Sequence, residues 1–399
     1  MRVLLSTWGS RGDVEPLLAL ALELRAQGVD VRMCAPPDFA ERVAEAGVAF
    51  VPMGFAVREL VASKPSPADV AAALVGQHFD VVGKAAQDCD ALVATGLMPA
   101  GMRSVAEHLD IPYVLAGFHM MGMPSLHRRP GPRPGGPFPA DETDFRVLWR
   151  IDGERVDAIY REPLNTHRAA LGMPPVGNVR DHVLTAHPWL AVDPVLWPPE
   201  DLLGLEPVQT GAWIMPDDRA LPADLVEFLD AGEPPVYVGF GSMQMAGAPD
   251  TAAVAVEAVR AQGHRVLVSG GWARLSLIDE EDDCFAVGEA NHSALFRRVA
   301  AVVHHGGAGT TTTAALAGAP QVIVPQIVDQ PYWAQRVAEL GIGAHHDGPI
   351  PTVASLSTAL EPALRDGTRT RAADVSTTIR TDGAAVAARR LVDLIGDGR

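Results

Sequence analysis

The sequence contains little cysteine and almost no lysine, and each shortage excludes a class of site. Its three cysteines, Cys34, Cys89 and Cys284, are widely spaced, and none forms a C-x-x-C pair. Neither a structural zinc site nor a disulfide framework is therefore expected, and the thiols are expected to be reduced and buried in a cytoplasmic enzyme. The two lysines, Lys64 and Lys84, follow no G-x-x-x-x-G-K-[ST] run, which excludes a P-loop nucleotide site.

A nucleophile elbow is also missing. The HGG run at residues 305–307 occurs in the oxyanion holes of some esterases, but that chemistry needs a G-x-S-x-G pentapeptide, and none is present. The loop Gly9–Asp13, which follows the first expected strand, lacks the G-x-G-x-x-G spacing of a dinucleotide-binding turn. Neither an esterase nor a dinucleotide fingerprint is therefore supported at these places.

An excess of positive charge is absent as well. The chain carries 32 Lys and Arg against 49 Asp and Glu, a formal net charge of −17. Such a chain is not expected to bind nucleic acid or to associate stably with a membrane, although local donors can still hold a small anionic ligand. The uncharged run His305–Val328 is long enough to span a membrane, but its glycines, two prolines and two glutamines favour a loop, a helix and a strand.

Apolar strands that alternate with helices organise the rest of the chain. Its 399 residues predict two domains, residues 1–205 and 206–382, followed by a C-terminal helix over 383–399. The alternation is typical of a parallel sheet covered on both faces, so we expect an α/β fold with two Rossmann-like doubly wound domains facing a central cleft. The principal expected strands are residues 3–7, 29–34, 48–51, 91–94 and 111–116 in the first half, and 236–240, 265–269, 284–287, 300–303 and 321–324 in the second.

Two proline-rich stretches interrupt this alternation. Residues 120–144 contain six prolines and are expected to form a long irregular loop with a functional role. Residues 188–216 show little periodicity and are interpreted as the linker between the domains. Between the two stretches, residues 144–171 are expected to be helical with an interruption near Pro163, and residues 183–186 to form a strand.

The clearest functional signal is a glycine-rich loop, Gly306–Gly309, between a buried strand and a helix expected to begin at Thr310. Such a loop presents unpaired backbone N–H groups and the positive end of the helix dipole, a combination that binds phosphate. The alternative is that the glycines only permit a tight turn. His304 and His305 before the loop favour the binding interpretation.

A polar pair follows the next expected strand. Asp329 and Gln330 lie just beyond Pro325, which ends the strand. Ligands of open α/β sheets bind at the carboxyl ends of the strands, so this pair and the glycine loop are expected to face one crevice.

The loop after the first strand offers a candidate base. Ser10 and Arg11 could reach a phosphate, and Asp13 is a candidate general base. The alternative for Asp13 is a capping carboxylate on the helix expected from about Glu15. His119, at the end of the strand over 111–116, is a weaker candidate for lining a substrate pocket.

At this point the residues amount to a known pattern. The chain resembles the family 1 glycosyltransferases of GT-B fold, particularly those that decorate glycopeptide antibiotics of the vancomycin type. The resemblance extends along the whole chain. It is less specific for the acceptor, because bacterial macrolide and sterol glycosyltransferases look similar at these places. The pieces that carry it include STWGSRGDVEPLLALA, VYVGFGSM, GEANHSALFRRVAAVVHHGGAGTT and PQIVDQPYWAQRVAELGIG.

The resemblance assigns roles to particular residues. Asp13 matches the catalytic base, where many relatives carry histidine, and the final helix is expected to return to the N-terminal domain. Trp8 is large where relatives tend to have a smaller residue, so with His119 and Met121 it is expected to line the acceptor pocket. The donor is expected to bind at Ser10, Arg11, Ser242, Asn291, His292, His304, His305, Gly306, Gly307, Ala308, Gly309, Thr310, Asp329 and Gln330. Within this set, His304 matches the histidine that touches the donor phosphates, Asn291 and His292 the nucleobase and ribose site, and Asp329 and Gln330 the sugar site.

The resemblance therefore implies an inverting transfer of a hexose from a UDP- or TDP-sugar to a hydroxyl of a glycopeptide aglycone or related natural product. The nucleotide-sugar is a substrate, and neither a cofactor nor a metal is expected. A sterol, other lipid or macrolide acceptor is the alternative within the class. A two-domain nucleotide-sugar epimerase is the alternative from another class, and incubation with the nucleotide-sugar alone distinguishes it.

Overall fold

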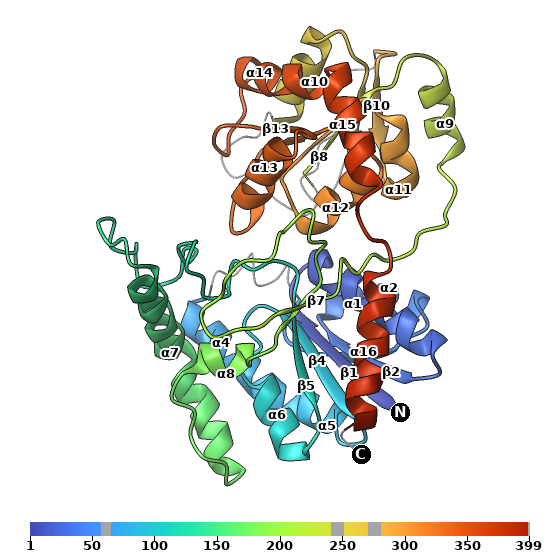
Figure 1. Cartoon of the computed structure of the whole chain (residues 1–399). Helices are drawn as coiled ribbons and strands as arrows, with labels where there is room; N and C mark the ends of the chain where they lie inside the picture. The colour runs from blue at the N-terminus through green and yellow to red at the C-terminus, as the bar shows by residue number, and fades with distance from the viewer. Residues whose placement is uncertain (57–64, 241–250, 270–280, 398–399) are drawn as a thin grey trace. The chain divides into compact units, whose positions relative to one another are not determined.

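The computed structural model describes residues 1–56, 65–240, 251–269 and 281–397 (Figure 1). They form two compact units, each built on its own parallel sheet. Unit 1 comprises residues 1–194, 198–215 and 380–399, and unit 2 comprises residues 195–197 and 216–379. The expectation of two doubly wound α/β domains is confirmed, and the main division falls after Met215 rather than after residue 205.

Unit 1 contains a seven-stranded sheet in the order β3-β2-β1-β4-β5-β6-β7, so its topological switch point lies between β1 and β4. Side chains alternate between the two faces: Val3 and Leu5 enter one apolar core, whereas Leu4 and Trp8 enter the other. The strands are β1 (Arg2–Trp8), β2 (Asp30–Ala35), β3 (Ala49–Pro52), β4 (Ala91–Gly96), β5 (Tyr113–Gly117), β6 (Trp189–Leu190) and β7 (Val208–Gln209).

Helices cover both faces of this sheet. The C-terminal helix α16 (Gly383–Asp397) packs with α1 (Arg11–Ala26) on one face, where Leu391 and Ile395 share a core with Leu17 and Leu20 (Figure 1). The other helices are α2 (Ala40–Glu45), α4 (Pro67–Gln77), α5 (Gly83–Ala85), α6 (Met102–Leu109), α7 (Phe145–Ala170) and α8 (Val179–Leu184), with a 3₁₀ turn at Pro37–Phe39 and a π-helical turn at His78–Val82.

Unit 2 contains a six-stranded sheet in the order β10-β9-β8-β11-β12-β13, with its switch point between β8 and β11. The strands are β8 (Val236–Gly239), β9 (Val266–Ser269), β10 (Cys284–Val287), β11 (Ala301–His304), β12 (Gln321–Ile323) and β13 (Gly343–His345). The helices are α9 (Ala223–Asp230), α10 (Thr251–Ala261), α11 (His292–Leu295), α12 (Ala308–Leu316), α13 (Gln330–Glu339), α14 (Val353–Ala363) and α15 (Asp366–Ser376), with a 3₁₀ turn at Phe296–Arg298.

Three local expectations are wrong. Residues 183–186 do not form a strand, because helix α8 occupies Val179–Leu184 and Asn178 caps it by accepting the N–H of Asp181 at 3.0 Å. Helix α7 continues through Pro163 without a break. Asp144 caps its start, and the helix ends only at Ala170, before Leu171.

The stretch 188–216 is not a simple linker either. It supplies β6 and β7, and the indole rings of Trp189 and Trp213 are buried in the core of unit 1. Strands of two residues are too short to produce a periodic pattern, which is why the sequence does not reveal them.

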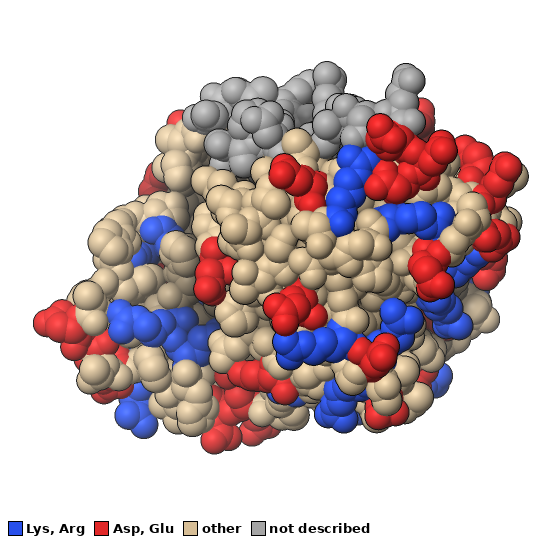
Figure 2. Space-filling view, turned by 90° about the horizontal axis from the view of Figure 1, so that it is seen from above, with Lys and Arg blue, Asp and Glu red and all other residues tan. Residues whose placement is uncertain are grey.

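The surface charge is mixed. On the face shown in Figure 2, blue basic residues are interspersed with red acidic ones and do not gather into a basic patch. No helix of the described residues is long and apolar enough to cross a membrane.

Candidate active site

The glycine loop of unit 2 lies at the switch point of its sheet. Strand β11 ends at His304, which lies in register between Gly239 of β8 and Ile323 of β12. The chain then forms the loop His305–Gly307 and enters helix α12 at Ala308. Ligands of doubly wound sheets bind beyond the carboxyl ends of strands at such a point.

Only glycine fits at position 306. Its φ is +91°, and a Cβ atom there would lie 2.7 Å from Cγ2 of Ile323 and 3.3 Å from Cβ of Gln330. The close approach to Gln330 also shows that the glycine loop and the Asp329-Gln330 turn lie side by side. The two motifs expected to face one crevice are therefore neighbours.

The N-terminus of α12 receives no cap from a side chain. Its N-cap is Gly307, which has no side chain to accept the N–H groups of the first turn. The hydroxyls of Thr311 and Thr313 donate backwards, to the carbonyl oxygens of Gly307 and Gly309, both at 2.9 Å. The N–H groups of Ala308 to Thr310 and the positive end of the helix dipole can therefore serve an anion.

His304 is completely buried beneath this loop. Its Nδ1 accepts the N–H of Gly306 at 3.1 Å, and its Nε2 lies 2.9 Å from Oε1 of Gln321. Burial lowers the pKa of His304 to about 3, which keeps the ring neutral. Both ring nitrogens are thus used inside unit 2, so the expected contact of this side chain with phosphate is not available in this structure. His304 supports the loop from below.

His305 is only partly buried and lies against the glycine loop. A Cβ atom on Gly307 would be 2.7 Å from its Nε2, so the imidazole covers the start of α12. Its Nδ1 is buried and has no hydrogen-bond partner among the described residues. Burial lowers the pKa of His305 to about 4, and the carboxylate of Asp329 opposes that shift. A neutral imidazole is therefore the form present at neutral pH.

The turn before α13 is shaped by Gln330. Its Oε1 accepts the N–H groups of Gln326 at 2.7 Å and of Ile327 at 3.1 Å, and the side chain is buried. Asp329 is half-buried, and its Oδ2 accepts the indole N–H of Trp333 at 2.6 Å. The amide oxygen of Gln330 therefore holds the turn, while the carboxylate of Asp329 lies nearer the surface.

Asn291 and His292, which are expected at the nucleobase site, make contacts within unit 2. Asn291 is buried, and its amide nitrogen donates to the carbonyl oxygens of Asp217 at 2.6 Å and Arg219 at 3.0 Å, while its oxygen caps α11. The ring of His292 stacks on Phe296 at 4.8 Å between centroids. Ser242 lies outside the described residues.

In unit 1, the loop after β1 is closed by its own side chains. Ser10 is the N-cap of α1, and Asp13 at the third helical position accepts the N–H of Ser10 on Oδ2 at 2.8 Å. Gly9 permits this, because a Cβ atom there would lie 2.2 Å from the same oxygen. Asp13 is half-buried, and Arg11 is exposed and pairs with Glu15 at 3.4 Å. Asp13 thus takes part in a cap and keeps a carboxylate at the C-terminal edge of the sheet.

Trp8 is buried, contrary to the expectation that it lines the acceptor pocket. Its side chain is buried against Leu74 and Gly54, and its indole N–H donates to the carbonyl of Phe55 at 3.1 Å. His119 and Met121 follow β5, two places along the sheet from β1, and Nδ1 of His119 accepts the N–H of Met121 at 3.2 Å. Both remain half-buried at this edge.

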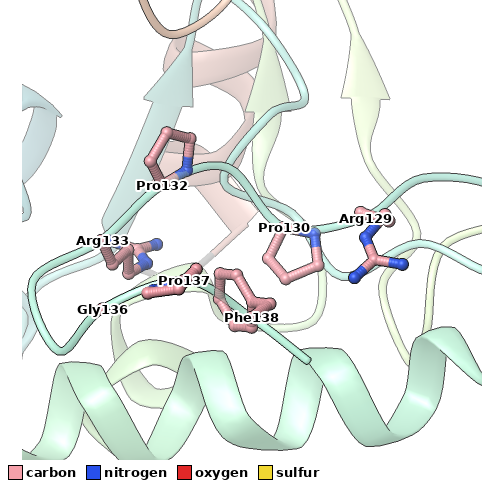
Figure 3. Close-up of a pocket in the computed structure, with 7 residues that line it drawn as sticks. All are labelled: Arg129, Pro130, Pro132, Arg133, Gly136, Pro137 and Phe138. Atoms are coloured by element: carbon pink, nitrogen blue, oxygen red, sulfur yellow. The ribbon is translucent and has the colours of Figure 1, made fainter. Parts of the chain in front are cut away.

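The proline-rich loop encloses a surface pocket of about 390 Å³. Figure 3 shows the two arms of the loop, with Pro130 and Pro132 on one and Pro137 and Phe138 on the other. The pocket is lined by Arg129, Pro130, Pro132, Arg133, Gly136, Pro137 and Phe138.

Helix α7 fixes this loop from below. Asp152, which is completely buried, accepts from Arg133 of the loop and from Arg180 of α8. Arg155 donates to the carbonyl of Gly136 at 2.8 Å, and its guanidinium lies 4.1 Å from the ring centroid of Phe138. The irregular stretch is therefore held in a defined shape by an ion pair to the buried Asp152 and by the guanidinium of Arg155, which the sequence pattern does not reveal.

Comparison with known proteins identifies matches along the chain. The glycosyltransferase family 28 N-terminal domain matches residues 3–118, and the erythromycin biosynthesis protein CIII-like C-terminal domain matches residues 282–388. The chain is 54% identical to glycosyltransferase GtfE of Amycolatopsis orientalis, over 100% of this chain and 98% of the relative. It is 53% identical to the vancomycin aglycone glucosyltransferase of the same organism, over 99% and 98% of the two chains. Among solved structures, the glycosyltransferase of kitacinnamycin has the same fold, with a TM-score of 0.74 at 21% identity over 99% and 98% of the chains.

Proposed function

This chain belongs to the GT-B glycosyltransferases represented by those relatives, and we propose that it glycosylates a glycopeptide antibiotic aglycone or a related natural product. The donor is a UDP- or TDP-hexose, and the transfer inverts the anomeric carbon. The observation that carries the proposal is the contact between Gly306 and Gln330, which joins an uncapped helix N-terminus to the Asp329 turn. A nucleotide-sugar needs both an anion site and a nearby polar group for its hydroxyls.

The diphosphate binds at the N-terminus of α12. Backbone N–H groups of Ala308 to Thr310 donate to its oxygens, and the helix dipole stabilises the negative charge. His305 adds a side-chain donor from above the loop, and His304 holds Gly306 in place from below. Ser242 remains a donor contact expected from the resemblance alone.

The sugar binds at the turn before α13. The carboxylate of Asp329 accepts hydrogen bonds from hexose hydroxyls, and Gln330 keeps the turn in shape. The bonds of Asn291 to Asp217 and Arg219 support a structural role for Asn291 near the nucleotide rather than a direct contact through its side chain.

Transfer proceeds by a single displacement. The carboxylate of Asp13 accepts the proton of the acceptor hydroxyl while the hydroxyl oxygen attacks the anomeric carbon. The glycosidic bond forms while the bond from that carbon to the diphosphate oxygen breaks. The electron pair leaves with the diphosphate, whose added charge the N-terminus of α12 stabilises. These groups allow the reaction to proceed without a metal ion.

The acceptor binds to unit 1 near the edge that carries Asp13. The prolines and the ring of Phe138 in the pocket of the irregular loop offer an apolar surface that suits an aromatic aglycone (Figure 3). His119 and Met121 follow strand β5 at the carboxyl edge of the same sheet, and they contribute to the acceptor site. The name of the vancomycin aglycone glucosyltransferase supports this class of acceptor.

A cytoplasmic location is also part of the proposal. Burial raises the pKa of Cys34 to about 12 and that of Cys89 to about 11, so both thiols stay protonated and unreactive. Buried reduced thiols suit a reducing compartment.

A mass-spectrometric screen tests the function. The protein is incubated with UDP- and TDP-hexoses and with glycopeptide aglycones, macrolides and sterols as separate acceptors. We expect one added hexose on a glycopeptide aglycone, and far less of that product from Asp13→Asn over the same time. Product formed only on sterols or macrolides would contradict the acceptor class, and a changed sugar without any acceptor would contradict transfer.

A further inference from the structure

Asp329 occupies the N-cap of α13 but does not cap it. Aspartate at this position normally accepts the N–H of the second or third helical residue. Here no such side-chain bond exists, and the second helical residue is Pro331, which has no N–H to donate. The carboxylate therefore needs another partner to hold its orientation.

That partner is Trp333. Its indole N–H donates to Oδ2 of Asp329 at 2.6 Å, and its side chain is completely buried. A charge-assisted bond from a buried, rigid ring fixes the carboxylate more tightly than an exposed donor could. Among the described residues, no hydrogen bond to the other oxygen, Oδ1, is present, which leaves that atom for a ligand hydroxyl.

The residue before Asp329 is strained. Val328 has φ of +55°, a conformation that is unfavourable for a β-branched residue. Its side chain and that of Ile327 are 52% and 55% exposed, so apolar packing does not hold them there. Backbone strain of this kind persists only where the surroundings impose it, and it clusters at ligand sites. Here the bonds from Gln326 and Ile327 to Gln330, and from Trp333 to Asp329, hold the residues on both sides of Val328.

The ring of Trp333 packs against Trp197, which is far away in the sequence. Trp197 meets it edge to face at 5.1 Å between centroids and stacks on Tyr332 at 3.6 Å. The guanidinium of Arg336 donates to the carbonyl of Val195 at 2.7 Å. Val195–Trp197 thus pack with unit 2, although the chain on both sides of them belongs to unit 1.

We infer that Trp333 is a positioning residue for the donor sugar, acting through the carboxylate of Asp329, and that Trp197 holds the indole in place. The inference rests on the proposed function, because it assigns to Asp329 the hydroxyls of a nucleotide-linked hexose. It predicts that the two tryptophans affect recognition of the hexose and leave recognition of the nucleotide diphosphate unchanged.

Calorimetric titration tests this with two ligands, the nucleotide diphosphate and the same nucleotide carrying the hexose. The measured quantity is the ratio of their two dissociation constants. Trp333→Phe keeps a ring in the core but removes the N–H, and we expect the ratio to shift about tenfold against the hexose ligand. The diphosphate alone should bind as in the unaltered protein. Trp213→Phe is the control, because Trp213 is also buried and donates its indole N–H to one acceptor, Thr210, at 3.0 Å.

A double-mutant cycle separates positioning from general damage. In an Asp329→Ala background, Trp333→Phe should cause no further shift in the ratio, because its only route to the sugar has been removed. An additive second shift, or equal weakening of both ligands, would overturn the inference. If Asp329→Ala itself left the ratio unchanged, the sugar site of the proposed function would fail instead.

Substitutions of Trp197 provide a second test, because Trp197 contacts Trp333 and not Asp329. Trp197→Ala removes this contact, and we expect a shift of about threefold in the same direction, whereas Trp197→Phe, which retains a ring on Tyr332, should restore most of it. Melting curves confirm that each variant is folded. A Trp197→Ala protein with an unchanged ratio would overturn the assignment to Trp197.

Discussion

Two loops border the switch points of the two sheets, and their helix N-termini are completed in opposite ways. After β1, Ser10 and Asp13 close a capping box, so the protein's own side chains serve the start of α1. After β11, Gly307 offers no side chain, and the start of α12 is left to another partner. Similar positions in similar sheets therefore have different electrostatic properties.

The cap residue, more than the number of glycines, therefore decides whether a helix N-terminus in this protein can bind an anion. The capped start of α1 presents the carboxylate of Asp13, which can take up a proton. The uncapped start of α12 presents N–H groups, which can stabilise negative charge. An inverting transfer needs one of each, a base for the acceptor and a stabilising site for the departing diphosphate.

The largest effect is expected for Asp13. Asp13→Asn retains an oxygen that can accept the N–H of Ser10 but loses basicity, so turnover should fall about 10²- to 10⁴-fold. Thermal stability and nucleotide binding should stay nearly unchanged, because asparagine can still take part in the cap. Steady-state rates and melting curves measure the two effects. Wild-type turnover would mean that the base lies elsewhere, and His119 would be the next residue to replace.

The next effect concerns the two histidines of the other loop. His305→Ala should weaken binding of the free nucleotide diphosphate by about 1.5–3 kcal/mol, the usual contribution of a hydrogen bond to a charged group. Isothermal titration measures this, with surface residue His345 replaced by alanine as the control. Unchanged affinity in a folded His305→Ala protein would remove this side chain from the anion site.

A pH dependence distinguishes the buried histidine. The folded-state pKa of His304 is lowered to about 3 from an unfolded value of 6.5, so the folded protein favours the neutral ring. Its contribution to stability is complete above about pH 6.5 and declines as the pH falls towards 3, because only the unfolded chain takes up the proton. Between pH 7 and pH 5 the free energy of unfolding should fall by about 2 kcal/mol less in His304→Gln than in the unaltered protein. Urea titrations at both pH values test this, and equal losses in the two proteins would contradict it.

The smallest effect is expected for the cap itself. Ser10→Ala removes the side chain that accepts the N–H of Gly12 at 3.3 Å, and it should cost about 1 kcal/mol of stability. Turnover should fall far less than in Asp13→Asn, because Ser10 is not the base. A denaturation midpoint equal to that of the unaltered protein would show that the cap contributes nothing.

Much of the fold follows from local sequence patterns. Runs of apolar residues such as Val3–Thr7 and Ala300–Val303 bury themselves in whichever sheet they enter, so their strands are predicted closely. The glycine loop was also predictable, since Gly306 requires a positive φ and a close approach that other residues cannot tolerate. The contact of that loop with the Asp329 turn follows from parallel strands that end at one edge.

Side-chain direction was not predictable in the same way. His304 and His305 are adjacent and chemically identical, yet one lies beneath the loop and the other covers the start of α12. Trp333 and Asp152 are also absent from the sequence-based site, because their partners, Asp329 and Arg133, take meaning only once two elements pack together.

Apolar periodicity and glycine conformation are local properties, so they already indicate the two α/β sheets, the order of the elements along the chain and the chemical groups at the loops. Packing, by contrast, determines which histidine reaches the surface, how residues 188–216 extend a sheet, and that Trp197 contacts Trp333. These features depend on burial and on hydrogen-bond partners, which come from residues far away in the chain. A side chain's solvent exposure is a property of the packed molecule, not of its neighbours in sequence.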